Sequence, residues 1–295
     1  MSRIYEAVQR ADRERDAAKG SEAKHASEPV IAPCVVELPE MKTDFDLSKI
    51  ARHPWKPFDA SLPTLAKRGA GVEQFRGLRS RIDQLRFQTP LKTILVSSGM
   101  PGEGKTFVAA NLALSMARNT VHNILLIDGD LRRGTLHSLL GAPNAPGLSE
   151  YLAGTAELTS IMQRSLAPEN AISDVMRTDS NITFIPSGLS SDSSSEVVAS
   201  HLMRDLIAIL SPHFDWIVID SPPVLAVTDA IELARAADAV LLVAREANTP
   251  LDVAQRTQAA FSNSRILGFV LNSVKKPPRN QPYSYYYGGE QGQRP

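Results

Sequence analysis

The chain has 295 residues, 43% of them hydrophobic, which is enough for one large globular α/β domain with extensions. Its 32 acidic and 32 basic residues balance, so charge gives no reason to expect a nucleic-acid partner. No apolar run approaches the roughly 20 residues of a membrane helix, and the first residues lack an apolar secretory core. The single cysteine, Cys34, allows no intrachain disulfide. Together these features favour a cytoplasmic location.

The chain begins with a segment of weak periodicity. Residues 2–19 predict a short charged helix that is either solvated or docks on a partner. Residues 20–70 contain six scattered prolines and predict a mostly flexible linker with local order. We therefore expect an N-terminal extension over residues 1–70, a folded domain over residues 71–274 and a flexible tail over residues 275–295.

The spacing of apolar residues predicts a helix over residues 72–88. On a neighbouring stripe, Glu73, Arg76 and Arg79 follow one another at intervals of three. An ordinary surface helix with an i,i+3 ion pair would explain them. A charged face for self-association would explain them equally well, and the sequence does not choose between the two.

A phosphate-binding loop dominates the sequence. Residues 99–106 match the P-loop pattern, with glycines flanking the required gap and Lys105 and Thr106 closing it. Glycines let backbone N–H groups turn toward phosphate oxygens, and the following helix adds its positive N-terminus. The lysine can reach the outer phosphates, and the threonine hydroxyl can ligate Mg²⁺. A buried strand over residues 93–98 and a helix over residues 106–119 provide the expected flanks.

Two further apolar strands end in carboxylates. The first, over residues 124–128, leads into Asp128, Asp130 and two arginines, and the second, over residues 215–220, ends in Asp220 as a Walker B strand does. Such strand ends bind ligands in doubly wound sheets. We also expect strands at 182–185, 239–244 and 266–271 and helices at 136–140, 148–152, 195–210, 229–237 and 250–261. This alternation predicts an α/β fold, a doubly wound and mainly parallel sheet with helices on both faces.

The last 21 residues contain a cluster of tyrosines, at positions Tyr283, Tyr285, Tyr286 and Tyr287. Neighbouring prolines and glycines disfavour a packed strand, so we expect this tail to be exposed. It is either a sticky aromatic segment or a set of phosphate acceptors that can enter an active site.

With these motifs in order, the chain resembles the cytoplasmic bacterial tyrosine autokinases of capsule and exopolysaccharide loci, and its N-terminal extension resembles those of the exosortase-associated group. The resemblance covers about residues 71–287 and rests on the charged helix, the P-loop, the two carboxylate-ended strands and the tyrosine tail. It implies a P-loop NTPase of the deviant-Walker type that uses ATP and Mg²⁺. The product would be phosphotyrosine in the tail, formed in trans within a ring-like homo-oligomer.

The resemblance also assigns roles to residues. Lys105, Asp128, Asp130 and Asp220 would be catalytic, with Asp128 helping to activate the tyrosine hydroxyl. Thr106, Asp128 and Asp220 would hold the metal, Glu73, Arg76 and Arg79 would mediate self-assembly, and Tyr283, Tyr285, Tyr286 and Tyr287 would accept phosphate. ATP would bind to Gly99, Met100, Pro101, Gly102, Glu103, Gly104, Lys105, Thr106, Phe107 and Asn272.

The family further implies two partners. One is a separate membrane polysaccharide co-polymerase that activates the kinase and recruits it to the inner face of the plasma membrane, and the other is a tyrosine phosphatase.

The chain departs from the family at two places. Gly134 replaces a proline after Arg133, which predicts a looser loop, and residues 188–195 replace a Pro-Asn-Pro element. Two alternatives are a partitioning or division-site ATPase switch and a nucleotide-dependent scaffold. The ATPase switches carry a second lysine early in the P-loop, and Gly99, Met100 and Pro101 offer none.

Overall fold

The computed structural model describes residues 47–119, 121–166, 181–189 and 196–274. They lie in one compact unit, which begins at Asp46. Its centre is an eight-stranded sheet in the order β1-β4-β5-β3-β6-β2-β7-β8. Neighbouring strands pair in parallel except at β4 and β5, which are antiparallel. The expected doubly wound, mainly parallel α/β fold is therefore confirmed.

The strands of the sheet are short at one edge and longer toward the other. They comprise β1 (Ala51–His53), β2 (Thr93–Ser98), β3 (Ile124–Asp128), β4 (Gln163–Ser165), β5 (Ile182–Ile185), β6 (Trp216–Asp220), β7 (Ala239–Arg245) and β8 (Ile266–Asn272). Every residue of the central strands β2, β3 and β6 is buried. Burial on both faces is what a continuous Val/Ile/Leu run produces in a parallel sheet covered by helices.

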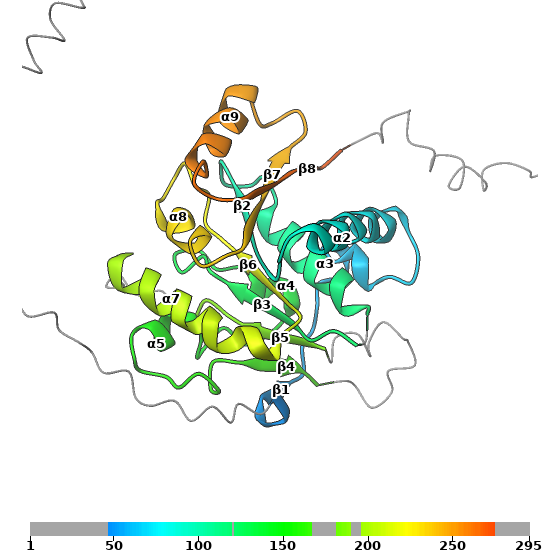
Figure 1. The fold of residues 1–295 in the computed structure, drawn as a ribbon. Coiled ribbons are helices and arrows are strands. Elements are labelled where there is room, and N and C mark those ends of the chain that lie inside the picture. Colours follow the sequence, from blue (N-terminus) through cyan, green and yellow to red (C-terminus); the bar gives the residue numbers. More distant parts are fainter. Residues whose placement is uncertain (1–46, 120, 167–180, 190–195, 275–295) are drawn as a thin grey trace, which may run out of the picture. The chain divides into compact units, whose positions relative to one another are not determined.

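Helices cover both faces, with α2 and α3 on one and α7, α8 and α9 on the other (Figure 1). The helices are α2 (Ala70–Gln88), α3 (Lys105–Ala117), α4 (Leu136–Leu140), α5 (Leu148–Leu152), α7 (Glu196–Leu210), α8 (Asp229–Ala234) and α9 (Leu251–Ala260). Short 3-10 turns add η1 (Leu47–Lys49), η2 (Asp59–Ser61), η3 (Pro63–Leu65) and η4 (Ser211–His213). None of the helices in the described ranges is both long and apolar enough to cross a membrane.

The segment before α2 differs from the expected linker. Residues 51–53 form β1 at the sheet edge, and Ile50, Leu62 and Thr64 are buried. The side chain of Asn111 on α3 holds this segment, since it accepts hydrogen bonds from the Thr64 hydroxyl (2.7 Å) and amide (3.3 Å) and donates to the Ser61 carbonyl (3.2 Å).

The expectation of a mostly flexible linker is therefore wrong for residues 47–70, and the folded unit begins well before residue 71. The local sequence could not predict this, because a three-residue strand with exposed and half-buried side chains has no periodicity. The helix expected over residues 2–19 and the tail over residues 275–295 lie outside the described residues.

Candidate nucleotide and phosphotransfer site

The P-loop lies between β2 and α3 as predicted, and Gly104 caps the helix. Gly102 and Gly104 have φ angles of 80° and 95°, a region that only glycine adopts without strain. Gly104 is also crowded, because a Cβ atom there would lie 2.0 Å from the Asn272 side-chain amide. These two glycines therefore shape the loop, and Asn272 at the end of β8 packs directly on it.

A buried carboxylate braces the loop from inside. Glu103 is only 1% exposed, and its Oε2 atom accepts a hydrogen bond from the Met100 amide at 2.8 Å. Its Oε1 atom accepts one from the Thr249 hydroxyl, and its backbone carbonyl accepts one from Asn272 at 2.9 Å. The Arg245 side chain donates to the Gly102 carbonyl at 3.3 Å. The loop after β7 and the end of β8 thus hold the P-loop in place.

The carboxylates predicted at two strand ends lie side by side. Asp128 and Asp220 are opposite each other in the pairing of β3 with β6, and both are fully buried. The Asp128 oxygens accept hydrogen bonds from the amides of Asp130 (3.2 Å) and Leu136 (3.0 Å). Backbone amides at both oxygens fix the orientation of this carboxyl group.

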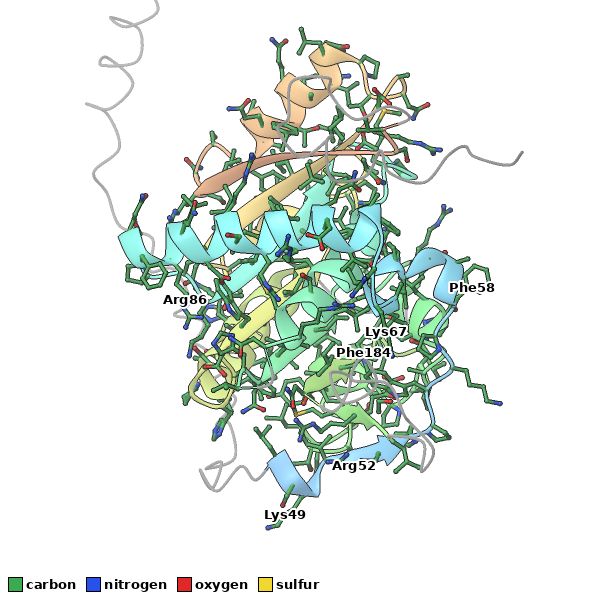
Figure 2. All side chains as sticks on the ribbon, turned by 90° about the vertical axis from the view of Figure 1, so that its right-hand side faces the viewer. Lys49, Arg52, Phe58, Lys67, Arg86 and Phe184 are labelled. Carbon is green, nitrogen blue, oxygen red and sulfur yellow. The ribbon has the colours of Figure 1, made fainter. Side chains whose placement is uncertain are left out.

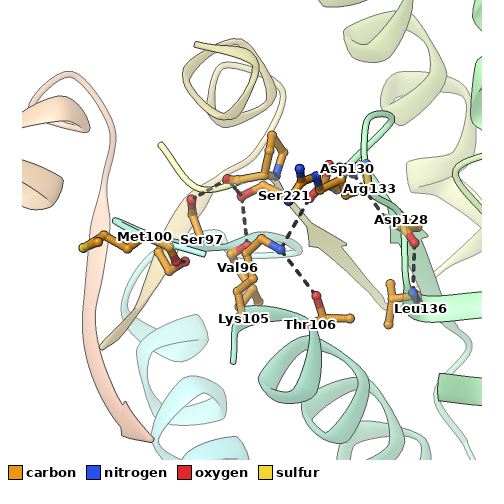
Figure 3. Close-up of polar contacts among 12 residues, drawn as sticks. Val96, Ser97, Met100, Lys105, Thr106, Asp128, Asp130, Arg133, Leu136 and Ser221 are labelled. Atoms are coloured by element: carbon orange, nitrogen blue, oxygen red, sulfur yellow. Dashed lines mark hydrogen bonds and ion pairs between the residues drawn. The ribbon is translucent and has the colours of Figure 1, made fainter. Parts of the chain in front are cut away.

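Lys105 connects the P-loop to these strand ends. Its Nζ atom lies 3.5 Å from Asp130 Oδ2 and 3.5 Å from the Thr106 hydroxyl (Figure 3). Asp130 in turn accepts a hydrogen bond from the Arg133 amide at 2.9 Å. The structure therefore brings Lys105, Thr106, Asp128, Asp130 and Asp220 together at one edge of the sheet.

Asp220 has the properties of a metal-binding carboxylate. Both of its side-chain oxygens are buried, and neither has a hydrogen-bond partner with good geometry in the described part of the chain. Unpaired buried carboxylate oxygens are costly, and a hard divalent cation would satisfy them. Mg²⁺ commonly combines one or two carboxylates with water and substrate phosphates, and Asp220 offers one such carboxylate.

The two buried carboxyl groups have raised pKa values. Burial first, and then the nearby charge of Asp220, raise the pKa of Asp128 to about 8, against the opposing effect of the two amides. Burial also raises the pKa of Asp220 to about 6, although Lys105 and the Thr106 hydroxyl favour its charged form. Strongly perturbed pKa values are found more often at functional sites than elsewhere.

Comparisons with known proteins agree with this geometry. The AAA domain family matches residues 91–254. The tyrosine-protein kinase YwqD of Bacillus subtilis is 31% identical over 216 residues, which cover 72% of this chain and 85% of that protein. The chain belongs to the bacterial tyrosine-protein kinase family.

Other members of the family match in sequence and in structure. The tyrosine-protein kinase wzc of Salmonella typhimurium is 36% identical over 218 residues, or 73% of this chain, but the match spans only 28% of that longer protein. The kinase domain of the Escherichia coli tyrosine kinase ETK superposes with a TM-score of 0.62 at 31% identity, covering 82% of this chain and 89% of that one. The resemblance inferred from the motifs is thus confirmed.

In this family member the loop after Arg133 is not loose. A Cβ atom on Gly134 would lie 2.0 Å from the Ser187 hydroxyl oxygen and 2.9 Å from Asp128 Oδ2. The expectation of a looser loop is therefore wrong, because glycine serves here for a close approach between the loop and the chain after β5. Ser187 itself donates to Asn144 Oδ1 at 3.2 Å, which ties the chain after β5 to the loop between α4 and α5.

The charged residues of α2 lie away from the strand ends. Glu73 and Arg76 form an ion pair with each other, with 34% and 61% of their side chains exposed. Arg79 instead turns inward and donates to the Ser115 carbonyl on α3. The i,i+3 ion pair of the surface-helix alternative is therefore present, and a role in self-assembly stays a prediction.

Phe107 and the tail tyrosines are the remaining predicted site residues. The partly buried Phe107 side chain packs against Phe75, with ring centroids 5.8 Å apart. The four tail tyrosines lie outside the described residues.

Sequence reasoning missed the bracing roles of Glu103, Thr249 and Arg245. The P-loop pattern leaves its intervening positions open, and the partners of Glu103 and Gly102 are about 140 residues away in the chain.

Proposed function

We propose that this protein is an ATP-dependent protein-tyrosine autokinase that transfers the γ-phosphate of ATP to tail tyrosines of a neighbouring copy. Membership of the bacterial tyrosine-protein kinase family supports the reaction class. The observation that carries the proposal is the buried pair Asp128 and Asp220 beside Lys105 and Thr106. The pair provides one carboxylate for the metal and a second that can act as the base a phenol hydroxyl needs.

The nucleotide would be held by the P-loop and its supports. Backbone N–H groups of residues 99–107 would surround the phosphates, except at Pro101, which has none, and Met100, whose N–H donates to Glu103. Lys105 would balance the negative charge of the phosphates. Asn272, which packs on Gly104, would border the base. Thr106 and Asp220 would hold Mg²⁺, directly or through its water, and the ion would neutralise charge on the transferring phosphate.

Asp128 would accept the proton of the incoming tyrosine. A phenol hydroxyl is a poor nucleophile near neutral pH, so a base must take its proton as phosphoryl transfer proceeds. Asp128 has one lone-pair direction of each oxygen occupied by a backbone amide, which leaves the others for the acceptor. Its pKa of about 8 lies near the working pH, where general bases are most effective. Asp130 would keep Lys105 oriented.

Transfer between copies would use the charged stripe of α2. Because Arg79 is held against α3, we expect the half-buried Glu73 and the exposed Arg76 to make the first contact with a neighbour in a ring-like assembly. Each phosphate added to Tyr283, Tyr285, Tyr286 or Tyr287 brings about −1.5 to −2 charges. The resulting repulsion would release the tails and loosen the assembly.

The biological setting is also part of the proposal. The kinase would act on exopolysaccharide or capsule polymerisation and export, recruited to the inner face of the membrane by a polysaccharide co-polymerase and reversed by a tyrosine phosphatase. The loops over residues 134–151 are candidate docking elements for that partner.

The test is incubation of the purified chain with Mg²⁺ and labelled ATP, followed by detection of phosphotyrosine. We expect a signal that is lost in Lys105→Met and in the variant with all four tail tyrosines changed to Phe. ATP hydrolysis without phosphotyrosine, also with the co-polymerase added, would contradict the proposal and favour an ATPase switch.

A further inference from the structure

A cavity of about 310 Å³ lies between α2 and the carboxyl-terminal end of α3, at the other end of that helix from the P-loop. No function assigned above uses it. Its apolar wall includes Val72, Met116 and Trp216, all of them buried. Figure 2 shows α2 crossing this face, with Arg86 toward its end. Arg86 lies 4.5 Å from the centre of the Trp216 ring and donates to the Asp215 carbonyl at 3.1 Å, and these contacts hold the lining residue Trp216.

The polar wall of the cavity is strongly basic. Three arginines, Arg76, Arg79 and Arg118, line it together with His122, and Asp83 is the only carboxylate in the lining. Arg76 is paired with Glu73 outside the lining. In the described part of the chain, neither Arg79 nor Arg118 has a carboxylate within ion-pair distance.

Arg79 and Arg118 are held beside each other by neutral groups. Arg79 donates to the Ser115 carbonyl, and Arg118 donates to the carbonyls of Thr64 (2.7 Å) and Ala66. The pKa of Arg118 is lowered, first by burial and then by the positive charge of Arg79, while the negative charge of Glu73 partly offsets both effects. Arginine nevertheless stays protonated in proteins. The fold therefore keeps two mutually repelling cations at one wall of a cavity.

We infer that this cavity binds a small phosphorylated compound, at a site separate from the P-loop. Guanidinium groups present several N–H donors in a plane and bind phosphate oxygens in pairs. The volume is at the lower end of the range for small-molecule sites, and such sites combine apolar walls with a few charged groups. A phosphate would lie against Arg79 and Arg118, with the body of the ligand against Trp216.

The site has a consequence for assembly. Arg76 and Arg79 are shared between the cavity and the stripe that we propose for self-association. A bound anion would neutralise part of that stripe, so we expect occupancy to weaken assembly through α2. This second consequence rests on the proposed role of the stripe, whereas binding of the anion does not.

The test is calorimetric titration of the full chain with pyrophosphate in metal-free buffer, in a Lys105→Met background that weakens the P-loop. We expect binding to weaken about tenfold or more in Arg118→Gln and in Arg79→Gln, because each removes one phosphate-binding guanidinium. Arg81→Gln is the matched control, since Arg81 is an exposed arginine of the same helix outside the lining. Arg118→Lys, which keeps the charge, should retain more of the affinity than Arg118→Gln.

Melting curves establish that each variant is folded, and light scattering is recorded in every titration. Equal affinity in Arg118→Gln, Arg79→Gln and Arg81→Gln would overturn the inference, as would the absence of any binding heat. If binding heat appeared only together with an increase in mass, a second copy of the chain would occupy the cavity and the inference would be wrong. Phosphotyrosine formation is measured separately, so failure here leaves the kinase proposal untouched.

Discussion

Replacing Asp220 by Asn should stabilise the nucleotide-free protein at alkaline pH. Asp220 is fully buried, with no hydrogen-bond partner of good geometry for either oxygen within the described residues. Its pKa rises from 3.8 to about 6, and one pKa unit corresponds to about 1.4 kcal/mol. Ionised Asp220 therefore costs the folded state on the order of 3 kcal/mol. Asn keeps the shape of the side chain and removes the charge.

The sign follows from proton linkage. Between the unfolded pKa of 3.8 and the folded value of about 6, the unfolded chain releases a proton that the folded chain keeps. The free energy of unfolding therefore falls as the pH rises through this window, and Asp128 extends the fall toward pH 8. The stabilisation by Asp220→Asn should reach about 3 kcal/mol above pH 6 and shrink as the pH approaches 4.

Urea denaturation between pH 5 and pH 8 measures this difference, with Asp252→Asn as the control for an exposed carboxylate, 70% exposed in the structure. Saturating Mg²⁺ and ADP should reverse the order, because only the wild type gains the full stabilisation from the bound metal. If Asp220→Asn were equal to or less stable than the wild type at pH 8 without nucleotide, the reasoning on the buried pair would be refuted.

Three further outcomes are expected. Asn111→Ala should lower the free energy of unfolding, measured by urea denaturation, by about 3 kcal/mol, because it leaves the buried Thr64 hydroxyl unpaired and frees the segment before α2. An effect below about 1 kcal/mol would mean that this segment is not part of the fold. Glu103→Ala should raise KM for ATP about tenfold with a smaller change in kcat, since it removes the acceptor for the Met100 amide. Glu103→Gln should recover part of the loss. An equal KM in the wild type and both variants would contradict the bracing role of Glu103. Gly134→Ala should slow phosphotyrosine formation about tenfold, because the added Cβ atom would displace the Asp128 carboxyl group. Nucleotide affinity, measured by fluorescence titration, should stay unchanged. A normal rate of phosphotyrosine formation would show that this close approach is not needed.

The parts of the fold that sequence predicts best are those with strong local signals. The three buried strands of the site end where their apolar runs meet a carboxylate or a glycine-rich loop, and α4 and α5 match the expected residues 136–140 and 148–152. Lys105, Thr106, Asp128, Asp130 and Asp220 could be grouped in advance, because parallel strands place their carboxyl ends at one edge.

The parts that sequence could not predict depend on distant partners. Strand β1 pairs with β4 across more than 100 residues, and β4 consists of Gln163, Arg164 and Ser165, three polar residues that are nevertheless buried. No hydrophobic period marks either strand. From the sequence alone, Gly134 suggests only a conformationally free backbone. The position of Ser187 in the fold shows that the glycine permits a close contact.

The inward turn of Arg79 is a similar case. Its spacing groups it with Glu73 and Arg76, whereas its hydrogen bond to Ser115 and the basic cavity arise from the packing of α2 on α3. Helical periodicity places residues on a face, but it does not determine whether a long side chain extends into solvent or folds back onto a neighbouring helix.

Transfer of phosphate between copies is the central claim, and a mixing experiment tests it most directly. One partner is Lys105→Met, which keeps its tail tyrosines but cannot use ATP; the other is the chain with Tyr283, Tyr285, Tyr286 and Tyr287 changed to Phe, which keeps its site. Neither should form phosphotyrosine alone with Mg²⁺ and ATP. Together they should form it on the Lys105→Met chain, distinguished by a size tag. No phosphotyrosine in the mixture, under conditions where the wild type is labelled, would contradict transfer between copies.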